Sequence, residues 1–276
     1  MFLDSLNSKI NERKALTVWG KEMAVAGQAA RESGKILKDL FGKITSIGKK
    51  GEIDLVTEAD LLSDKIIVEI IGGIFPRDSI LTEESGESGR DSGRQWIVDP
   101  LDGTTNFVHS FPFFAVSIAL RVDNEVVLGV VYNPVTDEYF EALKGEGAFL
   151  NKGPIRVSQT GDLKESLMAT GFPYSVYKEP GSIIELFKRM IVRAQGVRRP
   201  GAASIDLCYV ASGRLDGFWE EGLQPWDTAA GSIIVMEAGG IVSDYKGEAY
   251  SPFQKSIVAA NPIIHPKMVE LTSSAL

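Results

Sequence analysis

The stretch WIVDPLDGTTNF, residues 96–107, joins an apolar run to two aspartates and a glycine. Residues 96–98 are apolar, as in a buried strand, and Pro100 and Gly103 favour an abrupt change of direction after it. We therefore expect Asp99 at a strand end and Asp102 in a sharp corner. The polar residues after Gly103 are expected to open a helix whose free N–H groups point back at that corner.

This corner is a candidate site for an ion. Two carboxylates crowded into one volume repel each other, which raises their pKa values and destabilises the fold. A divalent cation removes that conflict, and free N–H groups at a helix start suit a phosphate. The pattern thus predicts a joint site for metal and phosphate. Taken alone it leaves a second interpretation open, because Asp-Gly is common in turns and both aspartates could simply shape one.

Three related motifs do not match the spacing. An EF-hand loop needs a polar ligand at its third position, where a count from Asp99 gives Leu101. Phosphatases that use an aspartyl nucleophile need an aspartate where this chain has Pro100. The chain has no Walker A sequence, and Leu150 stands where a dinucleotide fingerprint would need its third glycine.

Composition narrows the class of protein. The chain has 276 residues with 44% hydrophobic and 24% charged residues, which is typical of a soluble globular protein. Its net charge of -8 gives no electrostatic attraction for nucleic acid, so direct nucleic-acid binding is not expected. The N-terminus lacks the features of a signal peptide and the longest apolar run is too short to span a membrane, so we expect a cytoplasmic protein.

The side chains that could bind a metal ion are mostly carboxylates. One cysteine and two histidines leave few soft ligands, whereas Asp and Glu together number 37. A zinc site is therefore not expected, and a hard cation held by oxygens, above all Mg²⁺, is favoured. The single cysteine also excludes an intrachain disulfide and favours a reducing compartment.

Periodicity along the chain predicts helices and strands in two blocks. Apolar spacing predicts helices over residues 17–41 and 59–75, separated by a polar connector, residues 48–54, that we expect to be mobile. Apolar and alternating runs between residues 95 and 149 predict a mostly antiparallel sheet. After residue 155, strands and helices alternate, which predicts a mixed or parallel sheet. We expect two interlocked halves, residues 1–155 and 156–276, with the active site between them.

Other acidic residues could complete the corner. Glu83 and Glu84 end an apolar run, and Asp227 immediately precedes an expected helix, where it could be an ordinary N-cap. Asp60, in the segment DLVTEAD, could merely cap the second helix. Each residue is ambiguous alone, and the metal hypothesis depends on their combination with the corner.

Several segments resemble the linked motifs of the inositol monophosphatase family. They are LTEES (residues 81–85), WIVDPLDGTTNFVHSFPFFAVSIAL (96–120) and PWDTAAGSIIVMEAGG (225–240). The segments DLVTEAD (54–60) and RRPGAASIDLCYVASGRLDGFWE (198–220) also match in order. The resemblance runs from about residue 20 to the C-terminus and shows no departure at a metal position. It implies a layered αβαβα sandwich of the inositol monophosphatase and fructose-1,6-bisphosphatase type, usually a homodimer.

The resemblance also implies which residues form the site. The metal ligands would be Glu83, Asp99, the Leu101 carbonyl, Asp102 and Asp227, which would hold two or three Mg²⁺ ions. Asp60 and Thr104 would orient and deprotonate the attacking water, with Glu83 between metal and water, and the Gly103 and Thr104 amides would hold the phosphate. The substrate contacts would be Asp102, Arg198, Gly201, Ala202, Ala203 and Glu220. Lys49 would lie on the connector that folds over the site in this family.

The leading hypothesis is a magnesium-dependent, lithium-sensitive hydrolase of phosphate monoesters that acts on myo-inositol phosphate by direct attack of water. Fructose-1,6-bisphosphatase and histidinol phosphatase activities occur on the same scaffold and stay open as alternatives. A regulatory role beside RNA polymerase is the alternative from another class, since some bacterial relatives have one. No membrane contact is expected.

Overall fold

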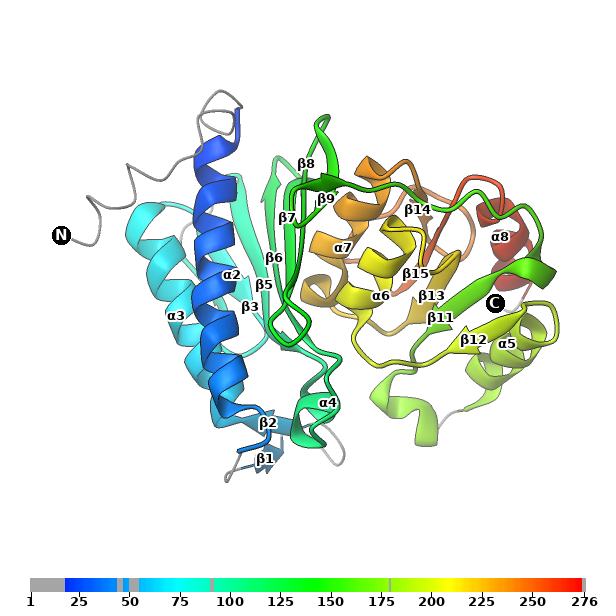
Figure 1. Ribbon diagram of the computed structural model, residues 1–276, viewed down its shortest axis with the longest axis horizontal. Coiled ribbons are helices and arrows are strands. Elements are labelled where there is room, and N and C mark those ends of the chain that lie inside the picture. Colours follow the sequence, from blue (N-terminus) through cyan, green and yellow to red (C-terminus); the bar gives the residue numbers. More distant parts are fainter. Residues whose placement is uncertain (1–17, 44–46, 50–54, 90–91, 179, 275–276) are drawn as a thin grey trace.

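The computed structural model describes residues 18–43, 47–49, 55–89, 92–178 and 180–274. These residues form five layers: a helix pair, a sheet, a second helix pair, a second sheet and a third helix pair (Figure 1). The predicted αβαβα sandwich is therefore confirmed. No helix in these ranges is both long enough and apolar enough to cross a bilayer.

The first layer consists of α2 (Gly20–Leu40) and α3 (Glu58–Ile74). Both helices end within three residues of the predicted limits, and Gly42 follows α2 with a φ of 73°, the left-handed conformation that commonly ends a helix. Their apolar faces pack on the larger sheet in one continuous core. Thr57 caps α3, and its hydroxyl accepts a hydrogen bond from the Ala59 amide at 3.1 Å.

The larger sheet has eight strands in the order β10-β9-β8-β7-β6-β5-β3-β4. Only β3 and β5 are parallel, so the expected mostly antiparallel sheet is confirmed. Its strands are β3 (Ser79–Thr82), β4 (Gly86–Ser88), β5 (Arg94–Asp102), β6 (Ala115–Val122), β7 (Glu125–Asn133), β8 (Glu138–Leu143), β9 (Gly147–Leu150) and β10 (Gly153–Pro154). The short β4 is exposed at the edge of the sheet.

The smaller sheet has five strands in the order β12-β11-β13-β15-β14 and is mixed, as predicted. Its strands are β11 (Leu167–Thr170), β12 (Gly196–Arg198), β13 (Gly217–Glu221), β14 (Ile241–Ser243) and β15 (Ser256–Ala260). We did not predict β12, because three residues inside a basic run carry too little alternation to be recognised as a strand.

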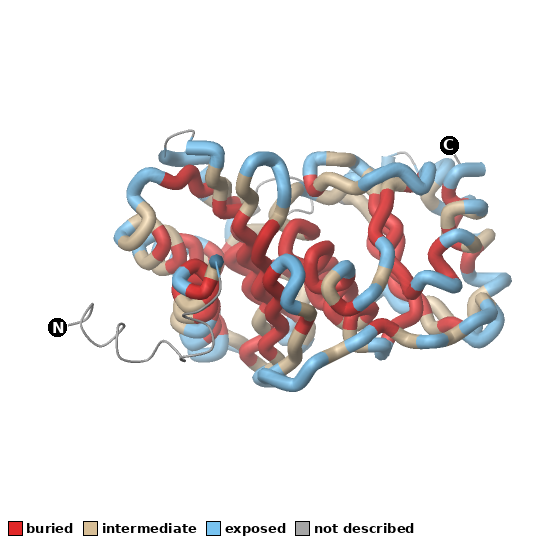
Figure 2. The backbone as a smooth tube through the Cα atoms, turned by 90° about the horizontal axis from the view of Figure 1, so that it is seen from above, coloured by how far each residue is buried: buried red, intermediate tan, exposed pale blue. Residues whose placement is uncertain are grey.

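Two helices, α6 (Ala203–Ala211) and α7 (Pro225–Glu237), lie between the sheets, and α5 (Gly181–Ile191) and α8 (His265–Ser273) cover the outer face of the smaller sheet (Figure 1). The central pair is apolar nearly all round, because it is covered on both sides. Figure 2 shows buried residues concentrated in the middle of the molecule and exposed ones along its rim. The division into residues 1–155 and 156–276 stays an interpretation.

The connector predicted to be mobile lies partly outside the described residues, which omit 50–54. Gly48 and Lys49 belong to β1 (Ile47–Lys49), whose backbone pairs antiparallel with β2 (Leu55–Thr57) just before α3. This small ribbon leads the chain directly to Thr57 and Asp60.

Candidate active site

The corner after residue 98 is built on a β-bulge. In the pairing of β5 with β6, Asp99 lies opposite Ser117 and Asp102 lies opposite Ala115. Between these two pairs β5 therefore has one residue more than β6. Side chains alternate along a regular strand, so residues three apart would face opposite sides. The extra residue at the bulge turns the side chains of both aspartates to the same face. Pro100, which has no N–H to donate, is one of the residues in the bulge.

Gly103 completes the corner. Its φ of 93° is a left-handed conformation, and a Cβ at this position would lie 3.0 Å from the Phe113 carbonyl oxygen, so both conformation and space favour glycine. The short helix α4 (Thr104–Val108) begins immediately after it. The expected helix opening is confirmed, with the first amides of α4 beside the corner.

Asp60 and Thr104 meet although they are 44 residues apart. The Thr104 hydroxyl lies 3.0 Å from Asp60 Oδ1 and 3.1 Å from the Leu101 carbonyl oxygen, so its proton has two acceptors. The other oxygen, Asp60 Oδ2, accepts from the Thr57 amide at 2.7 Å and the Thr57 hydroxyl at 2.6 Å. Asp60 therefore belongs to the capping box of α3 as the third residue of the helix, with Thr57 as the N-cap, and its remaining oxygen faces Thr104. Burial raises the pKa of Asp60, while these hydrogen bonds lower it.

Asp102 connects the corner to the central helices. Its Oδ2 accepts from the Ser204 amide at 2.7 Å and from the Ser204 hydroxyl at 2.5 Å, at the first turn of α6. The Ala202 side chain at the N-cap of α6 makes no capping bond, so a carboxylate from the other sheet takes that place. Burial raises the pKa of Asp102 to about 6, and the Ser204 hydrogen bonds limit the rise.

The acidic residues around Asp99 are electrostatically coupled. Burial raises the pKa of Asp99 well above its ordinary value, and the charges of Glu83, Asp102 and Asp227 raise it further. The Leu101 amide, which donates to Asp99 Oδ1 at 2.9 Å, acts in the opposite direction. These four carboxyl groups thus face a common volume in which negative charge is costly. Two come from β5, one from the turn that follows β3, and one from α7.

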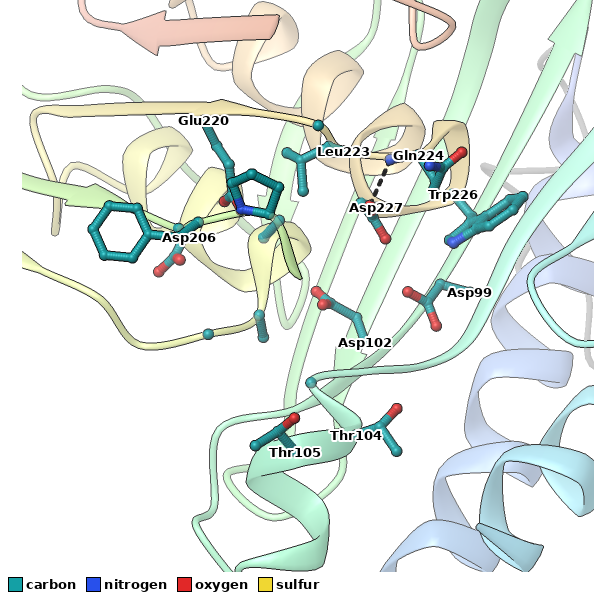
Figure 3. A pocket seen from close by; sticks show the side chains of 18 of the residues that line it. Asp99, Asp102, Thr104, Thr105, Asp206, Glu220, Leu223, Gln224, Trp226 and Asp227 are labelled. Carbon is teal, nitrogen blue, oxygen red and sulfur yellow. Dashed lines mark hydrogen bonds between the residues drawn. The ribbon is translucent and has the colours of Figure 1, made fainter. Parts of the chain in front are cut away.

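Asp227 is not an ordinary N-cap, which was one of the two interpretations of this residue. The N-cap of α7 is Gln224, and Asp227 is the third residue of the helix. The Gln224 amide donates to Asp227 Oδ2 at 2.7 Å (Figure 3), in the same pattern that Thr57 and Asp60 form at α3. Two helices on opposite sides of the sheet therefore each direct a first-turn aspartate toward the corner.

The ligand set fits magnesium better than a metal that needs a closed protein cage. No three Asp, Glu, His or Cys side chains within the described ranges converge on one point as they stand. Mg²⁺ is usually held by one or two carboxylates, with water and substrate oxygens completing its shell. Asp99 is buried beside other carboxyl groups, and a cation at this point would favour its ionised form.

The corner opens into a pocket of about 400 Å³ between the two sheets (Figure 3). One wall comes from β5 and α4, and the other from α6, β13 and the ends of β11 and β12. Most of the predicted site residues line it: Glu83, Asp99, Leu101, Asp102, Gly103, Thr104, Gly201, Ala202, Ala203, Glu220 and Asp227. Asp60 stands behind Thr104. The side chain of Lys49 lies outside the described part of the chain.

The pocket holds Arg199 where the resemblance had pointed to Arg198. Arg199 is a lining residue, whereas Arg198 is exposed at the end of β12, where its Nη1 donates to the Val197 carbonyl at 3.3 Å. Sequence reasoning missed Arg199, because two adjacent arginines give no sign of which one turns inward. It also missed Asp206, although Asp206 follows Ala203 by three residues on α6 and so lies on the same face of that helix.

Glu220 forms the back of the pocket on β13. It is 8% exposed, and burial followed by the charge of Asp227 raises its pKa to about 8. Its carboxyl group lies over Gly171, where a Cβ would come within 2.2 Å of the Glu220 oxygens. Glycine at the end of β11 thus makes the space that this side chain occupies.

Comparison with known proteins gives a consistent result. Residues 20–276 match the model of the inositol monophosphatase family. An inositol-1-monophosphatase from Synechocystis sp. is 46% identical over 248 residues, which cover 89% of this chain and 86% of that protein. The Nus factor SuhB of Salmonella typhimurium is 41% identical over 250 residues, which cover 90% of this chain and 94% of that protein.

Solved structures agree with these sequence matches. The extragenic suppressor protein suhB from Bartonella henselae has a TM-score of 0.89 at 42% identity and covers 93% of this chain and 100% of its own. An inositol monophosphatase from Anabaena has a TM-score of 0.86 at 39% identity and covers 94% of this chain and 97% of its own.

Proposed function

This chain belongs to the inositol monophosphatase family, and from that premise we propose that its pocket hydrolyses the phosphate monoester of a small polyol, with myo-inositol phosphate as the first substrate to test. The enzyme class, a phosphatase, follows from the family. The observation that carries the proposal is the bulge in β5, which brings Asp99 and Asp102 to one face beside the pair formed by Asp60 and Thr104.

The residues divide into a metal-binding group and a group that handles the water. Carboxylates from three elements, together with the Leu101 carbonyl, would hold two or three Mg²⁺ ions. Bound magnesium would neutralise the phosphate oxygens, lower the pKa of a coordinated water and offset the charge that develops on the leaving alcohol oxygen. Every ligand in this group is a hard oxygen, and Asp99 and Leu101 are each only 1% exposed. The metal ligands would be Glu83, Asp99, Leu101, Asp102 and Asp227.

The water-activating group is Asp60 with Thr104. The Thr104 hydroxyl is placed to accept a proton from the attacking water while it donates its own proton to Asp60 Oδ1, 3.0 Å away. Asp60 cannot turn away, because Thr57 binds its other oxygen through two hydrogen bonds. Glu83 would orient the same water from the opposite side. Water then attacks phosphorus directly, and Pro100 stands where an aspartyl nucleophile would otherwise be.

The remaining residues would hold the substrate. The Gly103 and Thr104 amides suit the phosphate oxygens, and Asp102 and Glu220 suit hydroxyl groups of the alcohol. Gly201, Ala202 and Ala203 leave room for the ring. We extend the substrate contacts to Arg199, which lines the pocket, and keep Arg198 and Lys49 as untested candidates. We also propose a homodimer that lithium inhibits.

Substrate profiling tests this proposal. The purified protein should release phosphate from myo-inositol 1-phosphate with Mg²⁺ and lose that activity in excess chelator, with recovery on addition of Mg²⁺. Fructose 1,6-bisphosphate and histidinol phosphate, assayed in parallel, test the two alternative activities on the same scaffold. Full activity in metal-free buffer, or no hydrolysis of any of the three esters with Mg²⁺, would overturn the proposal.

A regulatory role beside catalysis is the second candidate, because one relative is named a Nus factor. Such a role would depend on the protein surface rather than on the metal corner. Co-sedimentation with purified RNA polymerase, using wild type and Asp102→Asn, separates the two functions. A surface role predicts equal co-sedimentation of both proteins, and its absence in both removes this candidate.

A further inference from the structure

The far side of the pocket contains an acidic residue, Asp206, to which the mechanism above gives no role. Asp206 lies on α6, lines the pocket and is 1% exposed. Its Oδ1 makes no hydrogen bond with any residue that the structure describes. Buried acceptors without partners are rare in native proteins, so one inside a functional pocket needs an explanation. Rotation about the Cβ–Cγ bond lets either oxygen of the carboxyl group face the pocket.

The charges around Asp206 do not compensate it. Burial raises its pKa well above the ordinary value, and the carboxylates of Glu220 and Asp102 raise it further. Among the described residues, Arg199 opposes them, and its side chain is exposed and therefore partly screened by solvent. In Figure 3 the carboxyl groups of Asp206 and Glu220 lie on the side of the pocket away from Asp99. This side is thus acidic without belonging to the metal corner.

The shape of this side suits a ring that carries hydroxyl groups. Gly171 gives the Glu220 carboxyl its space, and the apolar side chains of Phe172 and Leu223 also line the pocket. Carboxyl groups accept hydrogen bonds from hydroxyls, while apolar side chains pack against carbon faces. A second phosphate would instead meet two carboxyl groups and one exposed arginine, which is an unfavourable balance.

We propose, on the basis of the phosphatase function above, that Asp206 is a specificity-determining residue that accepts a hydrogen bond from a ring hydroxyl of a neutral cyclitol or sugar monophosphate. Together with Glu220 it forms a hydroxyl-binding wall opposite the metal corner. The phosphate is bound at the corner and the polyol at this wall. Bound polyol supplies a hydrogen bond to the Asp206 oxygen that has no partner among the described residues. The same wall disfavours bisphosphates.

The test compares Asp206→Asn and Asp206→Leu with wild type on three esters in the presence of Mg²⁺. The esters are myo-inositol 1-phosphate, p-nitrophenyl phosphate, which has no hydroxyl group on its ring, and fructose 1,6-bisphosphate. For the inositol ester, kcat/KM should fall about tenfold in Asp206→Asn and further in Asp206→Leu, mainly through KM, because a site built to bind a hydroxyl loses discrimination when its partner is removed. For p-nitrophenyl phosphate, kcat/KM should change less than about twofold in both variants, since that ester has no ring hydroxyl to contact Asp206. The ratio of bisphosphate to inositol ester turnover should rise.

Asp137→Asn is the matched control. Asp137 is exposed in the turn before β8 and does not line the pocket, its φ of 56° is tolerated by asparagine, and Asp137→Asn is the same carboxyl-to-amide change as Asp206→Asn. It should behave as wild type on all three esters. Thermal unfolding should show both Asp206 variants at least as stable as wild type, because they remove a buried carboxyl group that lacks a partner.

Three outcomes distinguish a failure of the proposed function from a failure of the role given to Asp206. If wild type hydrolyses none of the esters, the proposed function fails before Asp206 is tested. If wild type is active and both Asp206 variants match Asp137→Asn on the inositol ester, Asp206 does not contact the polyol. If both variants lose equal activity on all three esters and unfold at lower temperature, Asp206 is a structural residue. Either of the last two results overturns the inference while leaving the metal corner intact.

Discussion

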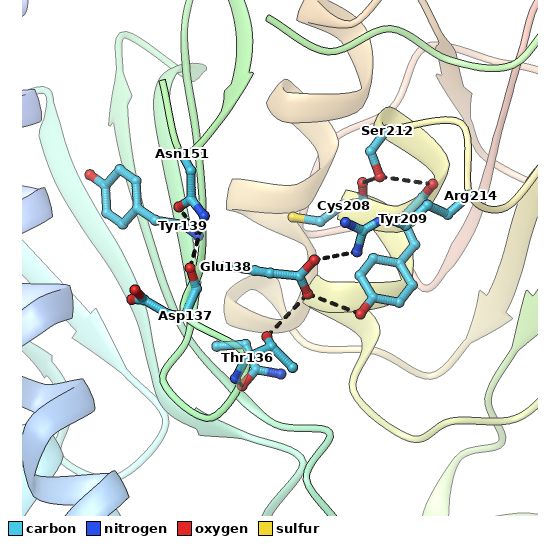
Figure 4. Close-up of polar contacts among 10 residues, drawn as sticks. Thr136, Asp137, Glu138, Tyr139, Asn151, Cys208, Tyr209, Ser212 and Arg214 are labelled. Carbon is cyan, nitrogen blue, oxygen red and sulfur yellow. Dashed lines mark hydrogen bonds and ion pairs between the residues drawn. The ribbon is translucent and has the colours of Figure 1, made fainter. Parts of the chain in front are cut away.

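Glu138 and the carboxylates of the pocket all lie between layers of the fold, but the groups that surround them differ. Glu138 starts β8 and reaches the end of α6, where its carboxylate pairs with Arg214 and accepts from the Tyr209 hydroxyl and the Thr136 hydroxyl, each at 3.1 Å (Figure 4). In the pocket, burial raises the pKa of Asp99, and the nearby carboxylates of Glu83, Asp102 and Asp227 raise it further.

This contrast separates structural from functional acidic residues. A carboxylate with its own arginine and hydroxyl partners stabilises the packing of two layers and needs nothing else. Carboxylates that burial and like charges both disfavour destabilise the fold, so their presence points to a ligand that compensates them. Composition alone cannot show the difference, because both groups consist of the same residue types.

The largest expected effect is on catalysis by the metal corner. Asp102→Asn should lower kcat by about a hundredfold or more, since one electrostatic contact in such a site supplies that much. Glu138→Gln, the matched carboxyl-to-amide change at the other region, should keep activity within about threefold. Initial rates of phosphate release with Mg²⁺ measure both variants against wild type. A loss below tenfold in Asp102→Asn, or equal losses in both variants, would make the corner structural.

The next prediction tests whether Asp60 and Thr104 act as one unit. Asp60→Asn and Thr104→Ala should each reduce kcat strongly, and the double variant should be little worse than either single change, because both residues serve one proton transfer. Steady-state kinetics on all three variants provide the measurement. Multiplicative losses would separate their roles and leave the 3.0 Å contact between them without a catalytic meaning.

A smaller effect is expected on the pH dependence of stability. The folded pKa of Glu220 is about 8 and its ordinary value is 4.5, so between these values the folded state binds one more proton than the unfolded chain. The contribution that the protonated Glu220 carboxyl group makes to stability is therefore complete below pH 4.5, and it is lost as pH rises through about 8. In chelator, wild type should unfold at lower temperature at pH 8 than at pH 6. Glu220→Gln should reduce this slope, and an unchanged slope would show that the folded carboxyl group has an ordinary pKa.

The smallest expected effect belongs to the compensated region. Glu138→Gln should lower stability by about 1 kcal/mol, because the ion pair with Arg214 is partly open to solvent and the hydrogen bond from Tyr209 is only partly buried. That change corresponds to a fall in melting temperature of about 2–4 °C for a protein near this size. Thermal unfolding in chelator, with Asp137→Asn as the neutral reference, measures it. A rise in melting temperature would mean that Glu138 resembles the pocket carboxylates after all.

Local sequence signals predicted much of the fold and of the site. The apolar run before Asp99, the break at Gly103 and the polar residues after it were enough to predict a strand, a corner and a helix start, because these features depend on neighbouring residues. Periodicity likewise placed the two long N-terminal helices within three residues of their observed ends. The layered arrangement came from the family resemblance rather than from periodicity.

Features that depend on tertiary contacts could not be predicted. Pro100 signals an interruption of β5, but the bulge that turns Asp99 and Asp102 to one face is a property of pairing with β6. Arg199 reaches the pocket from the end of β12, and β12 is held in the smaller sheet by its pairing with β11. The partnerless oxygen of Asp206 depends on what surrounds α6, and no pattern within the helix records that.

The most direct test of the central claim is whether Mg²⁺ stabilises the protein through the uncompensated carboxylates. Thermal unfolding of wild type, Asp99→Asn and Glu138→Gln is measured in chelator and with saturating Mg²⁺ and phosphate. A ligand at a hundred times its dissociation constant adds about 2.7 kcal/mol to the stability of the state that binds it. Wild type and Glu138→Gln should therefore gain several degrees alike, while Asp99→Asn should start at or above the wild-type melting temperature and gain little. An equal gain in Asp99→Asn, or no gain in wild type, would contradict the claim that these carboxylates exist to bind metal.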